Sequence, residues 1–292
     1  MSYTSPMLPE GTFKGKTIII TGGGTGLGKS VAMYLASLGA NIVITSRRAS
    51  VIEATAKEIE EKTGSQVLAV AGDVRDNASV EAVIEASIKR FGSIDLLLNN
   101  AAGNFVSPTE RLSHRAFESV IGIVLQGTIN FTLACGKYWI ANNIKGSILN
   151  ITTTYAFTGT AFTVPSACAK AGVMALTRSL AVEWGKKFGI RVNAVSPGPF
   201  PTEGAWDRLI PGNLKEIIDP TKRVPLNRVG EHQELANLCA YLLSDYAAYI
   251  NGADITIDGG EWLMGAGMFN SYLNIPEQAW DMLEAMRKGS QQ

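Results

Sequence analysis

Short apolar runs alternate with longer amphipathic stretches along most of the chain. The first run, Thr17 to Ile20, precedes a glycine-rich turn and an apolar-periodic stretch from Leu27 to Leu38. Runs of β-branched residues are typical of buried strands, and apolar positions recurring every three to four residues are typical of helices. By the same criteria we predict further strands at 41–45, 66–71, 94–98, 147–151, 190–195 and 254–257, with helices near 51–62, 79–91, 117–143, 166–188 and 231–244.

This alternation predicts a single-domain, Rossmann-type α/β fold. About seven strands joined by crossover helices form a doubly wound parallel sheet with helices on both faces, and such sheets bind ligands at the carboxyl ends of their strands. We expect this domain over 14–260, after an N-terminal extension over 1–13. A proline-rich stretch at about 200–228 is expected to be a lid, or alternatively a plain surface insertion.

The C-terminal extension, 261–292, is less usual for this fold. It contains a helix candidate after Asn274, with Trp280, Leu283 and Met286 on one face. An apolar helix face requires a partner surface. We expect the helix to pack either on its own subunit or on a neighbouring one.

Composition and charge narrow the classes of function. The 26 Lys and Arg balance the 26 Asp and Glu, so no net field favours nucleic acid. Three cysteines without CxxC spacing and two histidines predict neither a disulfide framework nor a metal site. No run approaches the roughly 20 apolar residues of a membrane span. We therefore expect a cytoplasmic protein of the bacterial type, or a mitochondrial matrix protein if the chain is a processed eukaryotic form.

The turn after the first strand carries the signature of a dinucleotide site. Glycines without side chains let the backbone approach a pyrophosphate, and the helix N-terminus that follows favours its charge. The alternative is a merely tight turn. The residues predicted to hold the pyrophosphate are Gly22, Gly24, Thr25, Gly26, Leu27 and Gly28.

The residues after the second strand indicate which dinucleotide binds. NAD-binding chains place a carboxylate there for the ribose 2′-hydroxyl, whereas this chain has Ser46 and Arg47 and no acid. An arginine suits a 2′-phosphate, so we predict NADP(H); the alternative is a solvated surface arginine. Beyond the third strand, Asp73 and Val74 are expected at the adenine. Small residues after the fourth strand are expected to admit the nicotinamide ribose: Asn100, Ala101 and Gly103.

Taken together, Thr21 to Gly28, Asn99 to Gly103, Lys170 and Pro197-Gly198 resemble the short-chain dehydrogenase/reductase family over roughly 14–260. The resemblance implies that Lys170, Pro197, Gly198 and Pro199 also contact the cofactor. It further implies a Tyr-x-x-x-Lys pair, in which the tyrosine acts as acid or base. Here the chain departs from the family, because Ser166 occupies the tyrosine position and Thr153 that of the catalytic serine.

A serine hydroxyl is too weak an acid to protonate an alkoxide unaided, which disfavours ordinary carbonyl reduction. Tyr155, eleven positions earlier, is the candidate replacement. With Asn104 and the Pro165-Ser166-Ala167 stretch, it gives the chain a resemblance to the 2,4-dienoyl-CoA reductases of this family. That resemblance implies a homotetramer acting in β-oxidation of unsaturated fatty acids. It implies that NADPH gives hydride to the δ-carbon of a dienoyl-CoA and that protonation at the α-carbon yields a 3-enoyl-CoA.

The expected roles follow from this chemistry. Tyr155 and Asn104 would form an oxyanion hole for the dienolate, Lys170 would bind the nicotinamide ribose, and Ser166 would orient the lysine or a water. Two rival functions stay open: another short-chain reductase of enoyl or 3-oxoacyl thioesters, and a catalytically silent NADP(H)-sensing protein.

Substrate contacts are harder to read from the sequence. Arginines that could meet the CoA phosphates are Arg75, Arg111 and Arg208, each alternatively an ordinary surface residue. An acyl chain needs an apolar groove, although loop aromatics are often only core. The candidates for this groove are Phe105, Phe157, Phe162, Phe200 and Trp206.

Overall fold

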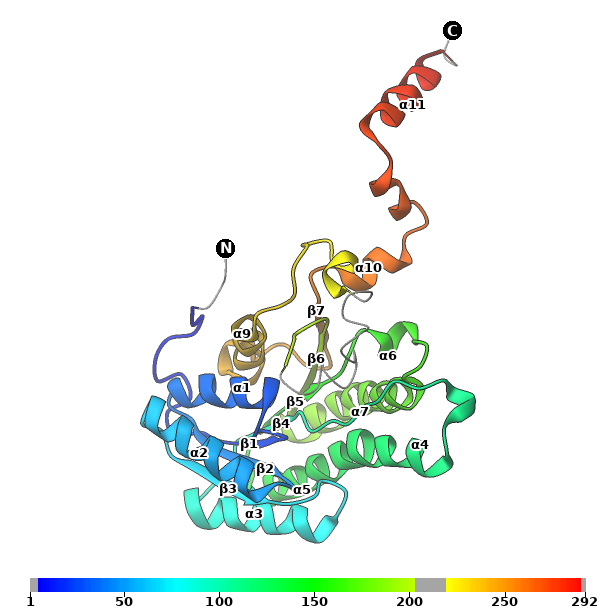
Figure 1. The fold of residues 1–292 in the computed structure, drawn as a ribbon. Coiled ribbons are helices and arrows are strands. Elements are labelled where there is room, and N and C mark those ends of the chain that lie inside the picture. The colour runs from blue at the N-terminus through cyan, green and yellow to red at the C-terminus, as the bar shows by residue number, and fades with distance from the viewer. Residues whose placement is uncertain (1–4, 203–218, 290–292) are drawn as a thin grey trace.

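A seven-stranded, all-parallel sheet forms the centre of the protein. The computed structural model describes residues 5–202 and 219–289, and its strands follow the order β3-β2-β1-β4-β5-β6-β7 (Figure 1). This confirms the predicted fold class and all seven predicted strands, with bounds shifted by up to two residues. The strands are β1 (Thr17–Thr21), β2 (Asn41–Ser46), β3 (Val67–Ala71), β4 (Leu96–Asn99), β5 (Ser147–Ile151), β6 (Arg191–Pro197) and β7 (Asp254–Ile257).

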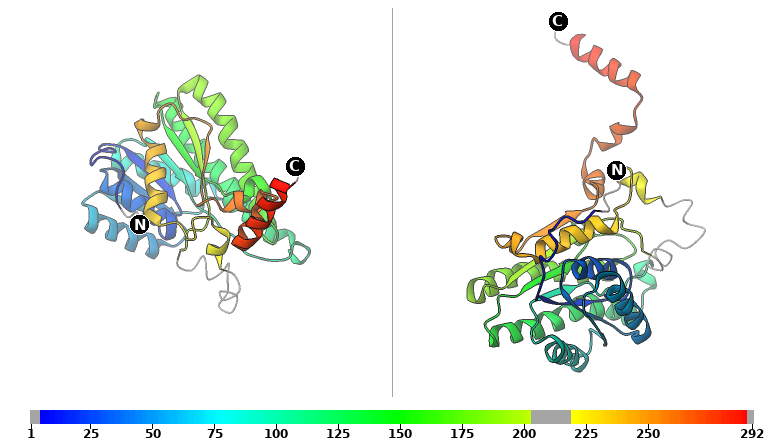
Figure 2. Two further views of the ribbon diagram at one scale, coloured as in Figure 1. Left: turned by 90° about the horizontal axis from the view of Figure 1, so that it is seen from above. Right: turned by 90° about the vertical axis from the view of Figure 1, so that its left-hand side faces the viewer.

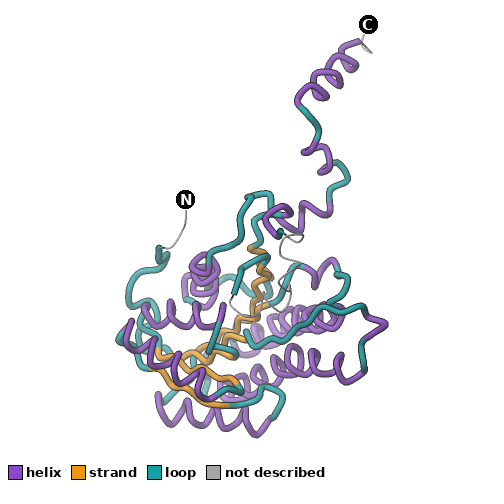
Figure 3. Tube along the Cα trace, in the orientation of Figure 1, coloured by secondary structure: helices purple, strands orange, loops and turns teal. Residues whose placement is uncertain are grey.

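Helices cover both faces of the sheet (Figure 3). Ile18 and Ile20 of β1 pack toward α1, α2 and α9, whereas Ile19 packs toward α3, α5 and α7. Burial on both faces explains why the strands read as continuous apolar runs. The helices are α1 (Gly26–Ser37), α2 (Ala49–Thr63), α3 (Asn77–Phe91), α4 (His114–Ile121), α5 (Gly127–Ala141), α6 (Tyr155–Thr158), α7 (Val164–Phe188) and α9 (His232–Leu243).

The helix predicted near 117–143 is interrupted. A π-helical segment, Gly122–Gln126, separates α4 from α5, and such bulges are frequent at functional sites. The whole stretch His114–Ala141 is long and apolar enough to cross a membrane by those measures alone, but half of its most apolar window is buried in the protein. It is also fixed to the segment just before β4, because Trp139 donates a hydrogen bond to the Ile94 carbonyl (2.8 Å). These contacts are those of a core helix.

The C-terminal extension leaves the body of the protein. After α10 (Glu261–Ala266), the chain runs outward to α11 (Glu277–Gly289), which stands clear of the sheet and its helices (Figures 1 and 2). The predicted helix is therefore present, but its apolar face does not pack on its own subunit. Trp280, Leu283 and Met286 are 47%, 45% and 70% exposed.

Much of the predicted lid, together with Arg208 and Trp206, falls within 203–218, outside the described residues. Of the described part, Pro220–Arg223 forms a short 3₁₀ turn near α10.

Candidate active site

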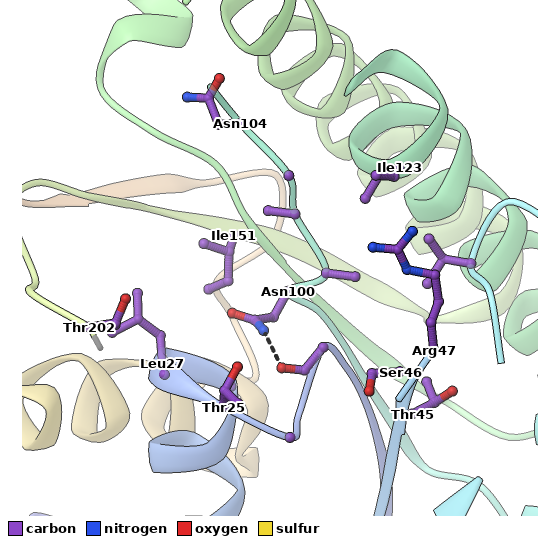
Figure 4. Close-up of a pocket in the computed structure, with 18 of the residues that line it drawn as sticks. Thr25, Leu27, Thr45, Ser46, Arg47, Asn100, Asn104, Ile123, Ile151 and Thr202 are labelled. Carbon is purple, nitrogen blue, oxygen red and sulfur yellow. Dashed lines mark hydrogen bonds between the residues drawn. The ribbon is translucent and has the colours of Figure 1, made fainter. Parts of the chain in front are cut away.

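A pocket of about 800 Å³ opens at the carboxyl ends of the strands, where a doubly wound sheet is expected to bind its ligand (Figure 4). It runs from the turn after β1, past the ends of β2 and β3, to the loop after β4 and the first turns of α7. Fifteen of the seventeen predicted cofactor residues line it. They are Gly22, Gly24, Thr25, Gly26, Leu27, Gly28, Ser46, Arg47, Asp73, Val74, Asn100, Ala101, Gly103, Lys170 and Pro197.

Close packing explains the glycines of the first turn. Gly22 has φ of +66°, and a Cβ on Gly28 would lie 2.4 Å from the Asn100 amide nitrogen. Asn100 uses that nitrogen to donate hydrogen bonds to the carbonyls of Thr21 (3.0 Å) and Gly22 (3.2 Å). Thr25, at the N-cap of α1, provides no side-chain cap. The N–H groups of the first turn therefore lack a side-chain cap and suit an anion.

The far end of the pocket is built for a phosphorylated nucleotide. Ser46 and Arg47 line it after β2, as predicted, and the Thr45 hydroxyl beside them is buried without a hydrogen-bond partner among the described residues. A buried polar atom of this kind normally has a partner, so a polar ligand group fits here. These residues fit NADP(H).

Arg75, a predicted CoA contact, pairs with Asp73 of the pocket lining. Its guanidinium donates two-point hydrogen bonds to Asp73, with Nη2 to Oδ2 at 2.5 Å and Nε to Oδ1 at 3.0 Å. The hydrogen bonds from Arg75, aided by the charge of Arg47, hold the pKa of the Asp73 carboxyl below its usual range. The sequence did not predict this pair, because Asp73 was assigned to the adenine and Arg75 to the CoA phosphates; both assignments stay predictions.

The three predicted polar residues of the reaction centre meet around one hydroxyl. Tyr155, at the start of α6, places its Oη 3.0 Å from Ser166 Oγ and 3.5 Å from Asn104 Nδ2. The Asn104 amide is oriented by the Phe105 backbone N–H, which donates to its Oδ1 (2.9 Å). When Ser166 donates to Tyr155, the tyrosine proton is free to point into the pocket. Ser166 thus contacts the tyrosine, whereas the sequence suggested that it orients the lysine or a water.

Lys170 lies one helical turn beyond Ser166, with only 7% of its surface exposed. Its ammonium donates a short hydrogen bond to the Ile151 carbonyl at the end of β5. Burial lowers the pKa of Lys170 from its usual 10.5 to about 8, against the opposing attraction of Asp254. The group is therefore still largely protonated at neutral pH and keeps this end of the pocket positive.

A few predicted residues lie elsewhere. Phe105 packs against Val120, Val124 and Ala169 instead of lining the pocket. Gly198 is required for packing, because a Cβ there would lie 2.5 Å from Cβ of Asp258, and Pro199 accepts a hydrogen bond from the Gly230 N–H (2.9 Å). Further residues that line the pocket outside the cofactor and catalytic assignments include Thr45, Thr152, Ile123 and Thr202.

The chain is similar to known proteins over most of its length. A family model described as enoyl-(acyl carrier protein) reductase matches residues 22–261. A crystal structure of a short-chain dehydrogenase from Bacillus anthracis is 47% identical and superposes with a TM-score of 0.77, covering 85% of this chain and 97% of the other. The chain belongs to the short-chain dehydrogenase/reductase family.

Two named relatives are also similar over most of their lengths. A probable 2,4-dienoyl-CoA reductase of Caenorhabditis elegans, named as (3E)-enoyl-CoA-producing, is 44% identical over 95% of this chain and 89% of its own. A probable 2,4-dienoyl-CoA reductase of Bacillus subtilis, named as (2E)-enoyl-CoA-producing, is 46% identical over 85% of this chain and 97% of its own.

Proposed function

We propose that the protein is an NADP(H)-dependent 2,4-dienoyl-CoA reductase. The observation that carries the proposal is the Tyr155 hydroxyl, which lies against Ser166 Oγ at 3.0 Å and beside the Asn104 amide at 3.5 Å. Ser166 occupies the position at which the family usually has its acid. The names of the relatives support the same substrate class.

Residues along the pocket would hold the cofactor, whose bound dihydronicotinamide supplies the hydride. The uncapped N-terminus of α1 would bind the pyrophosphate, Arg47 and Ser46 the 2′-phosphate, and Lys170 the nicotinamide ribose. The lysine fits this role because its ammonium is fixed on Ile151 at the end of β5, beside Tyr155.

Hydride addition to the δ-carbon of a conjugated thioester moves an electron pair onto the distant carbonyl oxygen. Two donors 3.5 Å apart, Tyr155 Oη and Asn104 Nδ2, can both lie within hydrogen-bond distance of that oxygen. Ser166 supports them by donating to Tyr155, which leaves the phenolic proton for the dienolate. A proton from solvent then adds to the α-carbon, which restores the thioester carbonyl and gives the 3-enoyl product.

The position of the new proton distinguishes two products. Reduction in deuterated water, followed by NMR of the product, should place the label at the α-carbon. Label at the γ-carbon would indicate a 2-enoyl product instead, as in the name of the Bacillus subtilis relative.

The direct test follows NADPH absorbance with a medium-chain trans,trans-2,4-dienoyl-CoA, with NADH as the alternative cofactor. A 2-enoyl-CoA and a 3-oxoacyl-CoA serve as substrate controls. We expect turnover of the dienoyl substrate alone. Turnover of the 3-oxoacyl control alone would assign the site to carbonyl reduction. NADPH binding without turnover of any substrate would indicate a protein that senses the cofactor.

The choice of cofactor should depend on Arg47. Charge-assisted hydrogen bonds are worth about 1.5–3 kcal/mol, so Arg47→Ala should raise KM for NADPH about 10- to 100-fold while changing KM for NADH little. Arg90→Ala, on α3 with its guanidinium over the Phe91 ring, is the matched control. Equal changes for both cofactors would contradict the assignment of Arg47 to the 2′-phosphate.

We also propose a homotetramer, to be checked by light scattering of the full chain. A mass equal to that of one chain would contradict it. Cytoplasmic or matrix localisation stays a prediction.

A further inference from the structure

His232 begins α9 and links this helix to two segments that lie far away in the sequence. It is half-buried, with Nδ1 2.8 Å from Ser30 Oγ of α1 and Nε2 2.7 Å from the Pro201 carbonyl oxygen. A carbonyl oxygen only accepts, so Nε2 carries the hydrogen of this second contact. In the neutral ring, Nδ1 then accepts from the Ser30 hydroxyl. The ring therefore ties the segment after β6 to the helix that begins at the glycine turn.

The segment after β6 is held at two points by the residues around the start of α9. Pro199 accepts a hydrogen bond from the Gly230 N–H (2.9 Å), and two residues later Pro201 accepts from His232. The bond to the Pro201 carbonyl restrains the planar peptide unit that joins Pro201 to Thr202. His232 therefore helps to set where Thr202 lies.

Thr202 lies against the turn to which the pyrophosphate is assigned (Figure 4). A Cβ on Gly26 would lie 3.1 Å from Thr202 Cγ2 and 3.7 Å from its Oγ1, and both residues line the pocket. Gly26 is the first residue of α1, whose N-terminus has no side-chain cap. A hydroxyl beside these N–H groups suits a phosphate oxygen, because it donates from a second direction. A dinucleotide bound at the turn can thus contact Thr202 as well as α1.

The two contacts of His232 lead to different parts of the protein. The contact with Ser30 joins α1 to α9, two helices that pack against each other, and Ser30 is not part of the pocket lining. The Ser30 hydroxyl can also donate to the Gly26 carbonyl (3.2 Å), so it has a second partner. The contact with Pro201 leads directly to Thr202 in the pocket. Removing the two contacts separately therefore distinguishes a structural link from a role in cofactor binding.

We propose that His232 is a positioning residue for the cofactor. It holds the Pro201 carbonyl and thereby keeps Thr202 against the bound pyrophosphate. The inference rests on the assignment of the pyrophosphate to the turn after β1, and it does not depend on which substrate is reduced. NADPH and NADH have the same pyrophosphate, so His232 should affect both cofactors equally. It differs in this from Arg47, which is assigned to the 2′-phosphate alone.

The test titrates three variants with NADPH and with NADH, and follows the fluorescence of the bound dihydronicotinamide. His232→Asn has too short a side chain to reach the Pro201 carbonyl. It should raise Kd for both cofactors about five- to tenfold, within the usual range for one hydrogen bond. His232→Gln can place its amide nitrogen near the position of Nε2 and should stay within about twofold of the wild type. Ser30→Ala, the matched control, removes the other contact and should also stay within about twofold.

A double-mutant cycle shows whether His232 acts through Thr202. Thr202→Ala alone should weaken the binding of both cofactors, and adding His232→Asn should weaken it by less than about a further twofold. Any of three results would overturn the proposal: full additivity of the two changes, equal losses in His232→Asn and His232→Gln, or a loss confined to NADPH.

A second measurement needs no change at His232. The chain has two histidines, His114 and His232, so NMR of the ring nitrogens after histidine labelling gives two sets of resonances, which His114→Gln assigns. Saturating NADPH should shift the His232 resonances, whereas adenosine 2′-phosphate, which has no pyrophosphate, should not. No shift with NADPH would overturn the proposal even if His232→Asn does not fold. Failure of the wild type to bind NADPH would instead refute the cofactor assignment, and neither experiment depends on dienoyl-CoA turnover.

Discussion

Replacement of Tyr155 by phenylalanine should lower kcat by about 10²- to 10³-fold, the usual loss when one donor to a developing oxyanion is removed. The change deletes one oxygen and leaves Ser166 Oγ and Asn104 Nδ2 without their shared partner. KM for NADPH should change little, because Tyr155 is assigned to the substrate. Steady-state kinetics with separate kcat and KM values measures the effect.

Tyr246→Phe is the control for this substitution, because Tyr246 is 63% exposed and follows α9, far along the chain from α6. Its kinetics should match those of the wild type. A fall in kcat of less than threefold for Tyr155→Phe would mean that another group stabilises the dienolate.

Lys170→Met should lower kcat/KM by at least about 100-fold. It should also abolish the fall of kcat/KM that the wild type shows at alkaline pH. The pH dependence of kcat/KM reports the pKa values of groups in the free enzyme. In the wild type, burial lowers the pKa of Lys170 to about 8. The protonated form supplies the positive charge, so wild-type activity should fall as pH rises through about 8. The residual activity of the variant should not show that fall. A wild-type profile that stays flat to pH 9.5 would contradict this role.

The same substitution should raise stability near neutral pH. Because the pKa of Lys170 is about 8 in the folded state and near 10.5 when exposed, the unfolded chain binds more protons between these values. Burial of the ammonium therefore costs stability below pH 8, and this cost disappears as pH rises toward 10.5. Lys170→Met should melt above the wild type at pH 7, with the gap narrowing on alkalinisation. Lys187→Met, on the exposed side of α7, is the control.

The sequence predicted the parts of the fold that depend on local pattern. Strands buried on both faces, such as β1 and β4, contain three consecutive apolar residues, Ile18 to Ile20 and Leu96 to Leu98. The glycine turn after β1 is visible because Gly22 and Gly28 leave no room for side chains. Tyr155 could be predicted because the expected tyrosine was missing at Ser166 while Lys170 was retained. The strands and the glycine turn follow from nearby physical constraints, whereas Tyr155 follows from the resemblance to the family.

The remaining features depend on contacts between distant segments. The hydrogen bond from Ser107 to Phe162 and the stacking of Trp262 on Phe157 join parts of the chain that no periodic pattern relates. The π-helical segment Gly122–Gln126 has the composition of an ordinary helix, so tertiary packing decides its form. The amphipathic pattern of α11 likewise does not show which surface its apolar face packs against.

The ion pair between Asp73 and Arg75 bears on how readily cofactor preference can change in evolution or design. Asp73 is the one carboxylate among the described residues that line the pocket, and Arg75 neutralises it. Positive charge at the nucleotide end therefore comes from Arg47 and Arg48, and no unpaired carboxylate among the described lining residues opposes it. Conversion to a non-phosphorylated dinucleotide would require two coordinated changes: loss of Arg47 and gain of a carboxylate that Arg75 does not capture. Loss of Arg47 alone would weaken NADPH binding without creating a group that binds the free ribose 2′-hydroxyl of NADH.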